Sequence, residues 1–443
     1  MSLLWKVPIV KHLCDLPIIP SDGETKQRRI GDDYMQIRIL AASAAITVAI
    51  FTAALAAPPP EAPPITAAPA LLGSAVQGKN YKVETPVASD GLLYVFKLDT
   101  PYGNYTVFGE QLLKLRLHEL AALEKLQELS QSEEFTKSLA SSIQQPVETV
   151  GKTLSNPFSL ITGTVSGVGE VFNKVSAGLH DPYDKREKAI DGLLGTSAAL
   201  RQLAYQYDVD PYTTFPALAA RLRDISKARA FGGLAVKGAE MAIPGAAGLA
   251  VSGLQSAGAL GALVRDKTVS ELDQINQAGL VKMGVDARVI DTFMSNQNYT
   301  PADKTLIVAA LASMDGVDDR TLYVAKISGA HSVDIAFFHR LQTQWIAAYH
   351  QKIAPLKAFV SALGFPLVLR ADGKLVGLFP IDTLAWTEET QKAAAAINDR
   401  VKSERSNGLE LRISGTVTDD AKKGLAKLGW KIHEKDTGLL DGR

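Results

Sequence analysis

Two histidines on one predicted helix are the first candidates for metal or acid–base chemistry. His339 and His350 lie eleven residues apart, which is close to three helical turns, so they share a face. They are about 16 Å apart along the axis, because each helical residue adds about 1.5 Å. One zinc ion instead requires histidines at a spacing such as i and i+4. The pair is therefore interpreted as two surface or partly buried histidines.

Carboxylate pairs are the next candidates, for general acid–base work or for calcium. Asp208 and Asp210 lack the further oxygen donors that a calcium loop supplies, so a turn and a cap are the favoured roles. Glu388-Glu389 and Asp419-Asp420 each fall in the first turn of a predicted helix. Negative charge there complements the helix dipole. All of these pairs are interpreted as structural.

The sequence lacks the short motifs that mark common catalytic and cofactor sites. It contains no HExxH, paired CxxC, P-loop, Rossmann fingerprint or EF-hand loop. Ser197 follows Gly195 in a segment superficially like a nucleophile elbow, but no closing glycine follows and the surrounding pattern is helical. We therefore expect no catalytic residue, no metal and no cofactor. An enzyme whose site is assembled from scattered residues is kept as an alternative.

Two tryptophans and an aspartate near the carboxyl end form the candidate binding surface. Trp386 lies beside the Phe379-Pro380-Ile381-Asp382 loop, and Trp430 begins a predicted last strand. A tryptophan at a strand end can form the floor of a binding pocket, although such rings more often belong to the core. Trp386, Asp382 and Trp430 are therefore the residues predicted to contact a ligand.

Composition bounds the class of protein. The chain has 443 residues, which is enough for two to four domains. Apolar residues make up 46% and charged residues 21%, and this balance excludes wholesale disorder. The formal net charge is zero, so the excess of positive charge that neutralises nucleic-acid phosphates is missing. A nucleic acid is therefore excluded as a partner.

The amino-terminal region is typical of an export signal. Arg38 precedes an uncharged, mostly apolar run over 39–55. Ala54 and Ala56 supply the small residues of an A-x-A cleavage site. Residues 35–56 are therefore predicted to be a cleaved signal peptide, with an uncleaved signal anchor as the alternative.

The flanks of this signal complete the amino-terminal organisation. Residues 1–34 do not fit a signal and are interpreted as an upstream extension, with Met35 as the initiator. The only cysteine, Cys14, lies in that extension, so the mature chain would have no disulfide and no thiol chemistry. Residues 57–80 are rich in proline and alanine, which predicts an extended spacer without a core. We therefore expect a periplasmic or extracellular protein.

Three structural regions are predicted after the spacer. Residues 81–130 alternate as a three-stranded β-meander and then change to a helical period. Residues 131–350 carry helical periods and capping motifs, including a Thr268–Glu271 capping box, and predict a helical domain. Residues 351–443 combine a hairpin, two further strands and two helices, which predicts a C-terminal α+β domain. The overall expectation is a mainly α fold.

A Gly/Ala-rich segment over 228–264 is predicted to lie at the centre of the helical domain. Ala242–Val264 is uncharged and about long enough to span a membrane. Its large apolar residues, however, contribute only about 2–4 kcal/mol toward insertion. Small residues that recur every four positions would let another helix approach closely: Gly248, Ser252 and Ser256 in one row, and Gly253, Ala257 and Gly261 in the next. A closely packed helix is favoured, and a membrane span is the alternative.

A family resemblance is carried by two stretches, AYQYDVDPYTTFPALAARL at 204–222 and ISGTVTDDAKKGLAKLGWKI at 413–432. They resemble segments of an uncharacterised family of exported bacterial proteins, over residues 180–435. The resemblance implies export and no particular activity. We therefore expect an exported, non-catalytic binding protein whose partner is an unknown protein or a component of the cell envelope. A membrane-associated protein that uses 228–264 is the alternative.

Overall fold

The computed structural model describes residues 58–132, 195–232, 259–362, 365–402 and 406–438. Of these residues, 51% are helical and 20% lie in strands, and the strands form three sheets. The expectation of a mainly α fold is therefore wrong, because the described part of the chain is mixed α/β. No helix within these ranges is long and apolar enough to cross a membrane.

Several predicted features lie outside the described residues. They are the extension 1–34, the signal peptide 35–56 with Ala54 and Ala56, and most of the Gly/Ala-rich segment, including Gly248, Ser252, Gly253, Ser256 and Ala257. Of that small-residue set, Gly261 is described. It is buried in α9 (Ala259–Asp266), which packs against α7 (Gly195–Gln206) and α12 (Pro301–Ala312).

Sheet A is antiparallel and is built around β5 (Tyr94–Thr100). The side chains of β5 alternate, so Tyr94, Phe96 and Leu98 enter the core while the intervening residues are more exposed. The other strands are β1 (Ile65–Thr66), β2 (Gln77–Gly78), β3 (Tyr81–Val83), β4 (Val87–Ser89) and β6 (Gly103–Phe108). β5 pairs with β3, β4 and β6, while β1 extends the sheet from β4 and β2 extends it from β3.

Residues 65–78 form two strands of this sheet and the short helical segments between them, although their composition predicts a spacer. They form β1, α2 (Ala68–Leu72), a 3-10 turn η1 (Gly73–Val76) and β2. Ala68, Leu72 and Ala75 are buried in the same core as β5. A strand of two residues is too short to show an alternating pattern, so composition alone cannot separate it from a linker.

The N-terminal unit consists of sheet A, α2, α3 (Glu110–Ser130), α7 and α8 (Pro216–Gly232), which share one hydrophobic core. The helical period predicted after residue 110 is confirmed, because Leu113, Leu117 and Leu120 are almost fully buried. α8 packs on both α3 and α7. The leucine face of α3 therefore joins the sheet to the helices of this unit.

The C-terminal unit begins with α9 and continues through five helices: α10 (Val269–Lys282), α11 (Ala287–Ser295), α12, α13 (Arg320–Ile327) and α14 (Val333–Lys352). The start signals predicted for this region are confirmed. Thr268 forms a complete capping box with Glu271, and Thr300 forms one with Asp303. Each box satisfies two backbone N–H groups that a helix start otherwise leaves without a partner.

Sheet B follows, with the strand order β13-β11-β9-β8-β7. Its strands are β7 (Leu356–Ala362), β8 (Phe365–Arg370), β9 (Leu375–Phe379), β11 (Leu409–Ile413) and β13 (Trp430–His433). β9, β11 and β13 are parallel, and α15 (Glu388–Lys402) and α16 (Asp419–Lys427) connect them. β10 (Thr383–Leu384) and β12 (Thr416–Val417) form the small parallel sheet C.

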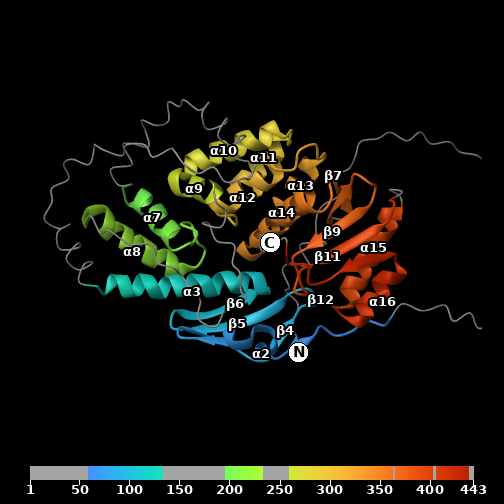
Figure 1. Ribbon diagram of the computed structural model, residues 1–443, viewed down its shortest axis with the longest axis horizontal. Coiled ribbons are helices and arrows are strands. Elements are labelled where there is room, and N and C mark those ends of the chain that lie inside the picture. The colour runs from blue at the N-terminus through green and yellow to red at the C-terminus, as the bar shows by residue number, and fades with distance from the viewer. Residues whose placement is uncertain (1–57, 133–194, 233–258, 363–364, 403–405, 439–443) are drawn as a thin grey trace, which may run out of the picture.

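Helices cover both faces of sheet B. α13 and α14 lie on one face, and α15 and α16 lie on the other (Figure 1). α14 also joins the two units, since Phe338 and Trp345 enter the core of sheet B while Phe337 and Leu341 enter that of the N-terminal unit. The helices α3, α13, α14, α15 and α16 pack on strands, while α7 to α12 pack mainly on other helices. The fold class was wrong because the sheets join these helices in shared cores instead of leaving a separate helical domain.

Candidate functional site

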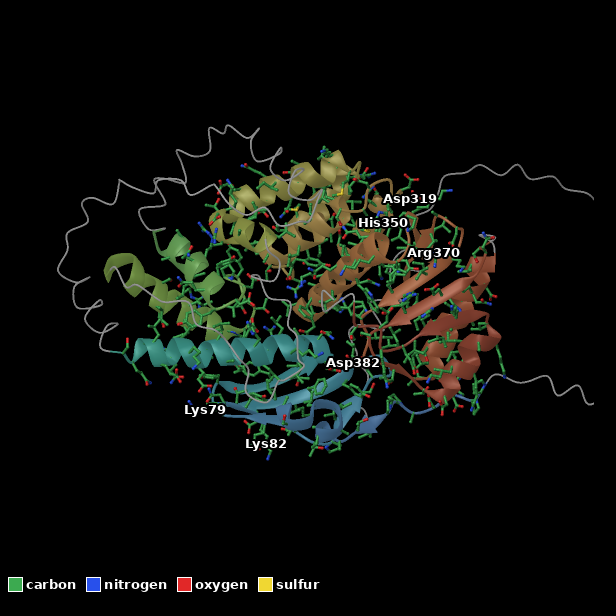
Figure 2. The ribbon with its side chains drawn as sticks, viewed as in Figure 1. Lys79, Lys82, Asp319, His350, Arg370 and Asp382 are labelled. Carbon is green, nitrogen blue, oxygen red and sulfur yellow. The ribbon has the colours of Figure 1, made fainter. Side chains whose placement is uncertain are left out.

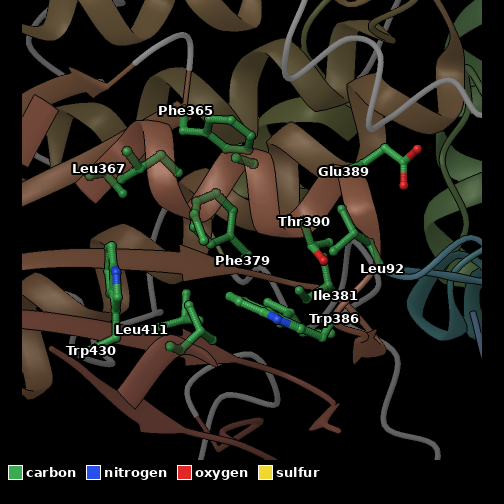
Figure 3. Close-up of a pocket in the computed structure, with 15 residues that line it drawn as sticks. Leu92, Phe365, Leu367, Phe379, Ile381, Trp386, Glu389, Thr390, Leu411 and Trp430 are labelled. Atoms are coloured by element: carbon green, nitrogen blue, oxygen red, sulfur yellow. The ribbon is translucent and has the colours of Figure 1, made fainter. Parts of the chain in front are cut away.

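An apolar cavity of about 90 Å³ lies between sheet B and its covering helices α15 and α16 (Figure 3). Its walls include Leu367, Phe379 and Leu411 of the sheet, Ala394 and Ile397 of α15, and Leu425 of α16. Ligand sites in proteins are concave and mostly apolar, with a few placed polar groups. This cavity is therefore the leading candidate for a binding site in the described part of the chain.

The cavity exists because α15 turns small side chains toward the sheet. Ala393 and Ala394 line it, at positions where a helix that covers a sheet usually carries larger residues. They belong to a run of four alanines over 393–396. That run was the sequence signal for the cavity, but a run of alanines also fits an ordinary helix, so it did not identify a site.

Two of the three predicted contact residues line this cavity. Trp386 and Trp430 are only 3% and 7% exposed, and their rings stand on either side of Leu411 (Figure 3). Gly424 of α16 allows the close packing of Trp386, because a Cβ atom there would lie 2.2 Å from the indole Cζ2. The two rings are thus both part of the core and part of the cavity wall.

Hydrogen-bonding groups at the cavity are few. Thr390 already donates its hydroxyl to the backbone carbonyl of Ala385 at 2.6 Å, and Glu389 is exposed at the rim. The indole Nε1 of Trp430 is buried and has no partner among the described residues. This N–H does not open into the cavity, so the cavity wall is almost entirely apolar.

The third predicted residue, Asp382, lies elsewhere. It occupies the loop before β10, where the C-terminal unit meets sheet A (Figure 2). Its carboxylate Oδ2 accepts the backbone N–H of Tyr94 at 2.9 Å and that of Glu110 at 3.0 Å. Glu110 is the first residue of α3, and its N-cap residue Gly109 has no side chain to offer. Asp382 therefore caps a helix of the other unit.

Burial dominates the ionisation of Asp382. It raises the pKa of this carboxyl from 3.8 to about 7, and the charges of Glu110 and Asp90 act in the same direction. The two backbone N–H groups oppose this and lower the pKa. Asp382 is thus a buried junction residue whose charge depends on pH near neutrality, and it is not a residue of the cavity.

A second pocket of about 50 Å³, with several charged residues in its wall, lies between the two units and is lined by residues of α3, the α7–α8 loop, α12 and α14. Asp210 accepts the hydroxyl of Thr300 at 2.7 Å, and Asp303 pairs with Arg340 at 3.2 Å. Burial raises the pKa of Asp210 to about 7, and the nearby charge of Asp303 adds to the effect. This pocket joins the units through buried polar groups.

The other candidates have local structural partners. Asp210 accepts the backbone N–H of Tyr212 at 2.8 Å, as the predicted turn requires. His339 is fully buried, while His350 accepts the backbone N–H of Leu356 on its Nδ1 at 3.0 Å. Among the described residues, no group of three or more His, Cys, Asp or Glu could hold a metal ion.

No protein-family model, curated protein or solved structure matches this chain. The resemblance to exported bacterial proteins therefore stays a prediction. The case for function depends on the geometry of the described residues.

Proposed function

We propose that this chain is an exported binding protein whose C-terminal unit takes a small apolar ligand into the cavity between sheet B and α15. The observation that carries this proposal is a preformed cavity whose walls are almost entirely apolar. Export is supported by the signal pattern over 35–56. No catalytic step is part of the proposal.

The size of the cavity limits the ligand. A volume of about 90 Å³ holds about six water-sized groups. That corresponds to a short alkyl chain, and 2-pentanone is a water-soluble probe of this size. Burial of about five carbon atoms at about 0.8 kcal/mol each gives about 4 kcal/mol, which is a Kd of about 1 mM.

We expect Ala394→Leu to weaken this binding, because the added carbon atoms would occupy part of the cavity that Ala394 lines. The measurement is an NMR titration with 2-pentanone, read at the indole N–H signals of Trp386 and Trp430. Wild type should shift saturably, and Ala394→Leu should weaken binding by about tenfold or more. Ala395→Leu is the matched control, since Ala395 is exposed on the same helix. Equal binding by wild type and Ala394→Leu would contradict the proposal.

We also expect the exported protein to begin at Ala57. Cleavage after Ala56 follows from the small residues at Ala54 and Ala56. Amino-terminal sequencing of protein recovered outside the cytoplasm tests this. A purified protein that begins at Met1 or Met35 would instead show that no signal is removed, and the export part of the proposal would fail.

A further inference from the structure

A short proline-rich strap from the start of the described chain lies on the C-terminal unit. The indole Nε1 of Trp386 and the side-chain amide of Gln391 both donate to the carbonyl of Pro58 at 3.2 Å. The backbone N–H of Glu61 donates to the carbonyl of Trp386 at 3.0 Å. More than 320 positions separate the strap from these partners, so the contact is a docking of one segment on another.

The strap has the pattern of a polyproline II helix. Pro58, Pro59 and Pro60 have their φ angles fixed near the value of that helix. Burial then repeats every third residue: Pro58, Glu61 and Pro64 are half-buried, while the four residues between them are exposed. Polyproline II has three residues per turn, so one edge of the strap faces the C-terminal unit.

The surface under the strap supplies two kinds of contact. Trp386 offers an indole N–H to a strap carbonyl, which suits the solvated backbone of polyproline II. The carboxylate of Glu61 accepts the backbone N–H of Trp386 and the hydroxyl of Thr418, the N-cap of α16. Helix starts favour negative charge. This surface therefore binds a proline carbonyl and a carboxylate three residues later at the same time.

We propose that the surface formed by Trp386, Gln391 and Thr418 is a docking site for a proline-rich segment of a partner protein, with glutamate three residues after a proline, and that Pro58–Glu61 occupies it in cis. The strap holds its place through hydrogen bonds at the surface, and Pro59 and Pro60 are exposed. A segment held in this way can be exchanged for one of the same chemistry. This proposal does not depend on a ligand in the cavity.

The cis strap competes with any partner. A tethered segment acts at an effective concentration on the order of millimolar, so a free peptide binds wild type weakly. A variant that weakens the contact between the strap and this surface should therefore bind a free peptide more tightly. Glu61→Ala removes the acceptor for Trp386 and Thr418 and should release the strap.

The test uses a fluorescein-labelled peptide of residues 57–64 and anisotropy with the full chain. Glu61→Ala should bind it about tenfold or more tightly than wild type. The same peptide with glutamine for glutamate should bind Glu61→Ala about tenfold more weakly, because a charge-assisted bond is lost. Glu84→Ala, which alters an exposed glutamate of the N-terminal unit, is the matched control and should behave as wild type.

Three results would overturn the proposal. Glu61→Ala and wild type could bind the peptide equally, or the glutamine peptide could bind as well as the original. Sedimentation could also show that Glu61→Ala or wild type forms dimers that exchange straps, which would make a second copy the occupant. Titration of Glu61→Ala with 2-pentanone separates the two proposals, because Glu61 does not line the cavity.

Discussion

Replacement of Asp382 by alanine should lower the free energy of unfolding by about 2–4 kcal/mol, because one buried and one partly buried backbone N–H group lose their acceptor at about 1–3 kcal/mol for each fully buried group. Those groups belong to Tyr94 and Glu110, and the second is the first residue of α3. Urea unfolding at about pH 4 measures the effect, because the carboxyl is then still mostly protonated in the folded protein and ionisation contributes little to the difference. A change below about 1 kcal/mol would show that water replaces the carboxylate at this junction.

Asp382→Asn is the informative partner variant, because its carbonyl oxygen can accept both N–H groups without carrying a charge. The pKa of Asp382 is raised from 3.8 to about 7 by burial. Below pH 3.8 the carboxyl is protonated in both the folded and the unfolded protein, so its ionisation takes nothing from the free energy of unfolding. As pH rises toward 7, the unfolded chain ionises first and stability is lost, by on the order of 4 kcal/mol in total.

Asp382→Asn should therefore gain stability relative to wild type as pH rises from 4 to 8. Asp210 has its pKa raised in the same direction, to about 7, so the stability of the variant should still fall with pH because of Asp210. The measurement is urea unfolding of both proteins at several pH values. If the difference in free energy of unfolding between the two proteins stays constant with pH, Asp382 is already ionised in the folded protein well below neutrality.

The role of Asp382 shows where sequence reasoning stops. Its position near Trp386 was identified, but the backbone N–H that it accepts lies 272 residues away in the chain. Local signals did better, because their partners are close in sequence: Thr268 and Glu271 form the predicted capping box at the start of α10. The hairpin predicted within 351–443 is also present, as the antiparallel pair β8 and β9.

The fold class was wrong for a related reason. Periodicity identifies an apolar face but not the element that covers it. The faces of α13 and α14 fit a helical bundle as well as they fit sheet B, and sequence spacing does not distinguish the two. The cavity could not be predicted either, because it depends on how far α15 is held from the sheet while Ala393 and Ala394 leave the space unfilled.

Replacement of Arg340 by methionine should destabilise the protein by about 3–5 kcal/mol, because it leaves a buried carboxylate without its partner. The Arg340 and Asp303 side chains are 12% and 10% exposed, and they lie 3.2 Å apart. The guanidinium also stacks over the ring of Phe337 at 4.6 Å. Arg288→Met is the matched control, since that side chain is 95% exposed and should change stability by less than about 0.5 kcal/mol.

The double variant Asp303→Asn with Arg340→Met separates charge from packing. Asparagine can still accept the backbone N–H of Thr300, which Asp303 accepts at 3.2 Å in its capping box. If the stability lost in Arg340→Met comes mainly from the unpaired charge of Asp303 beside Asp210, Asp303→Asn should recover about half of the lost stability or more. If the double variant is as unstable as the single one, the cost is the lost contact with Phe337. Urea unfolding of all four proteins in the cycle decides between these causes, and the first result would mean that paired charge stabilises the packing of α12 on α14 within the C-terminal unit.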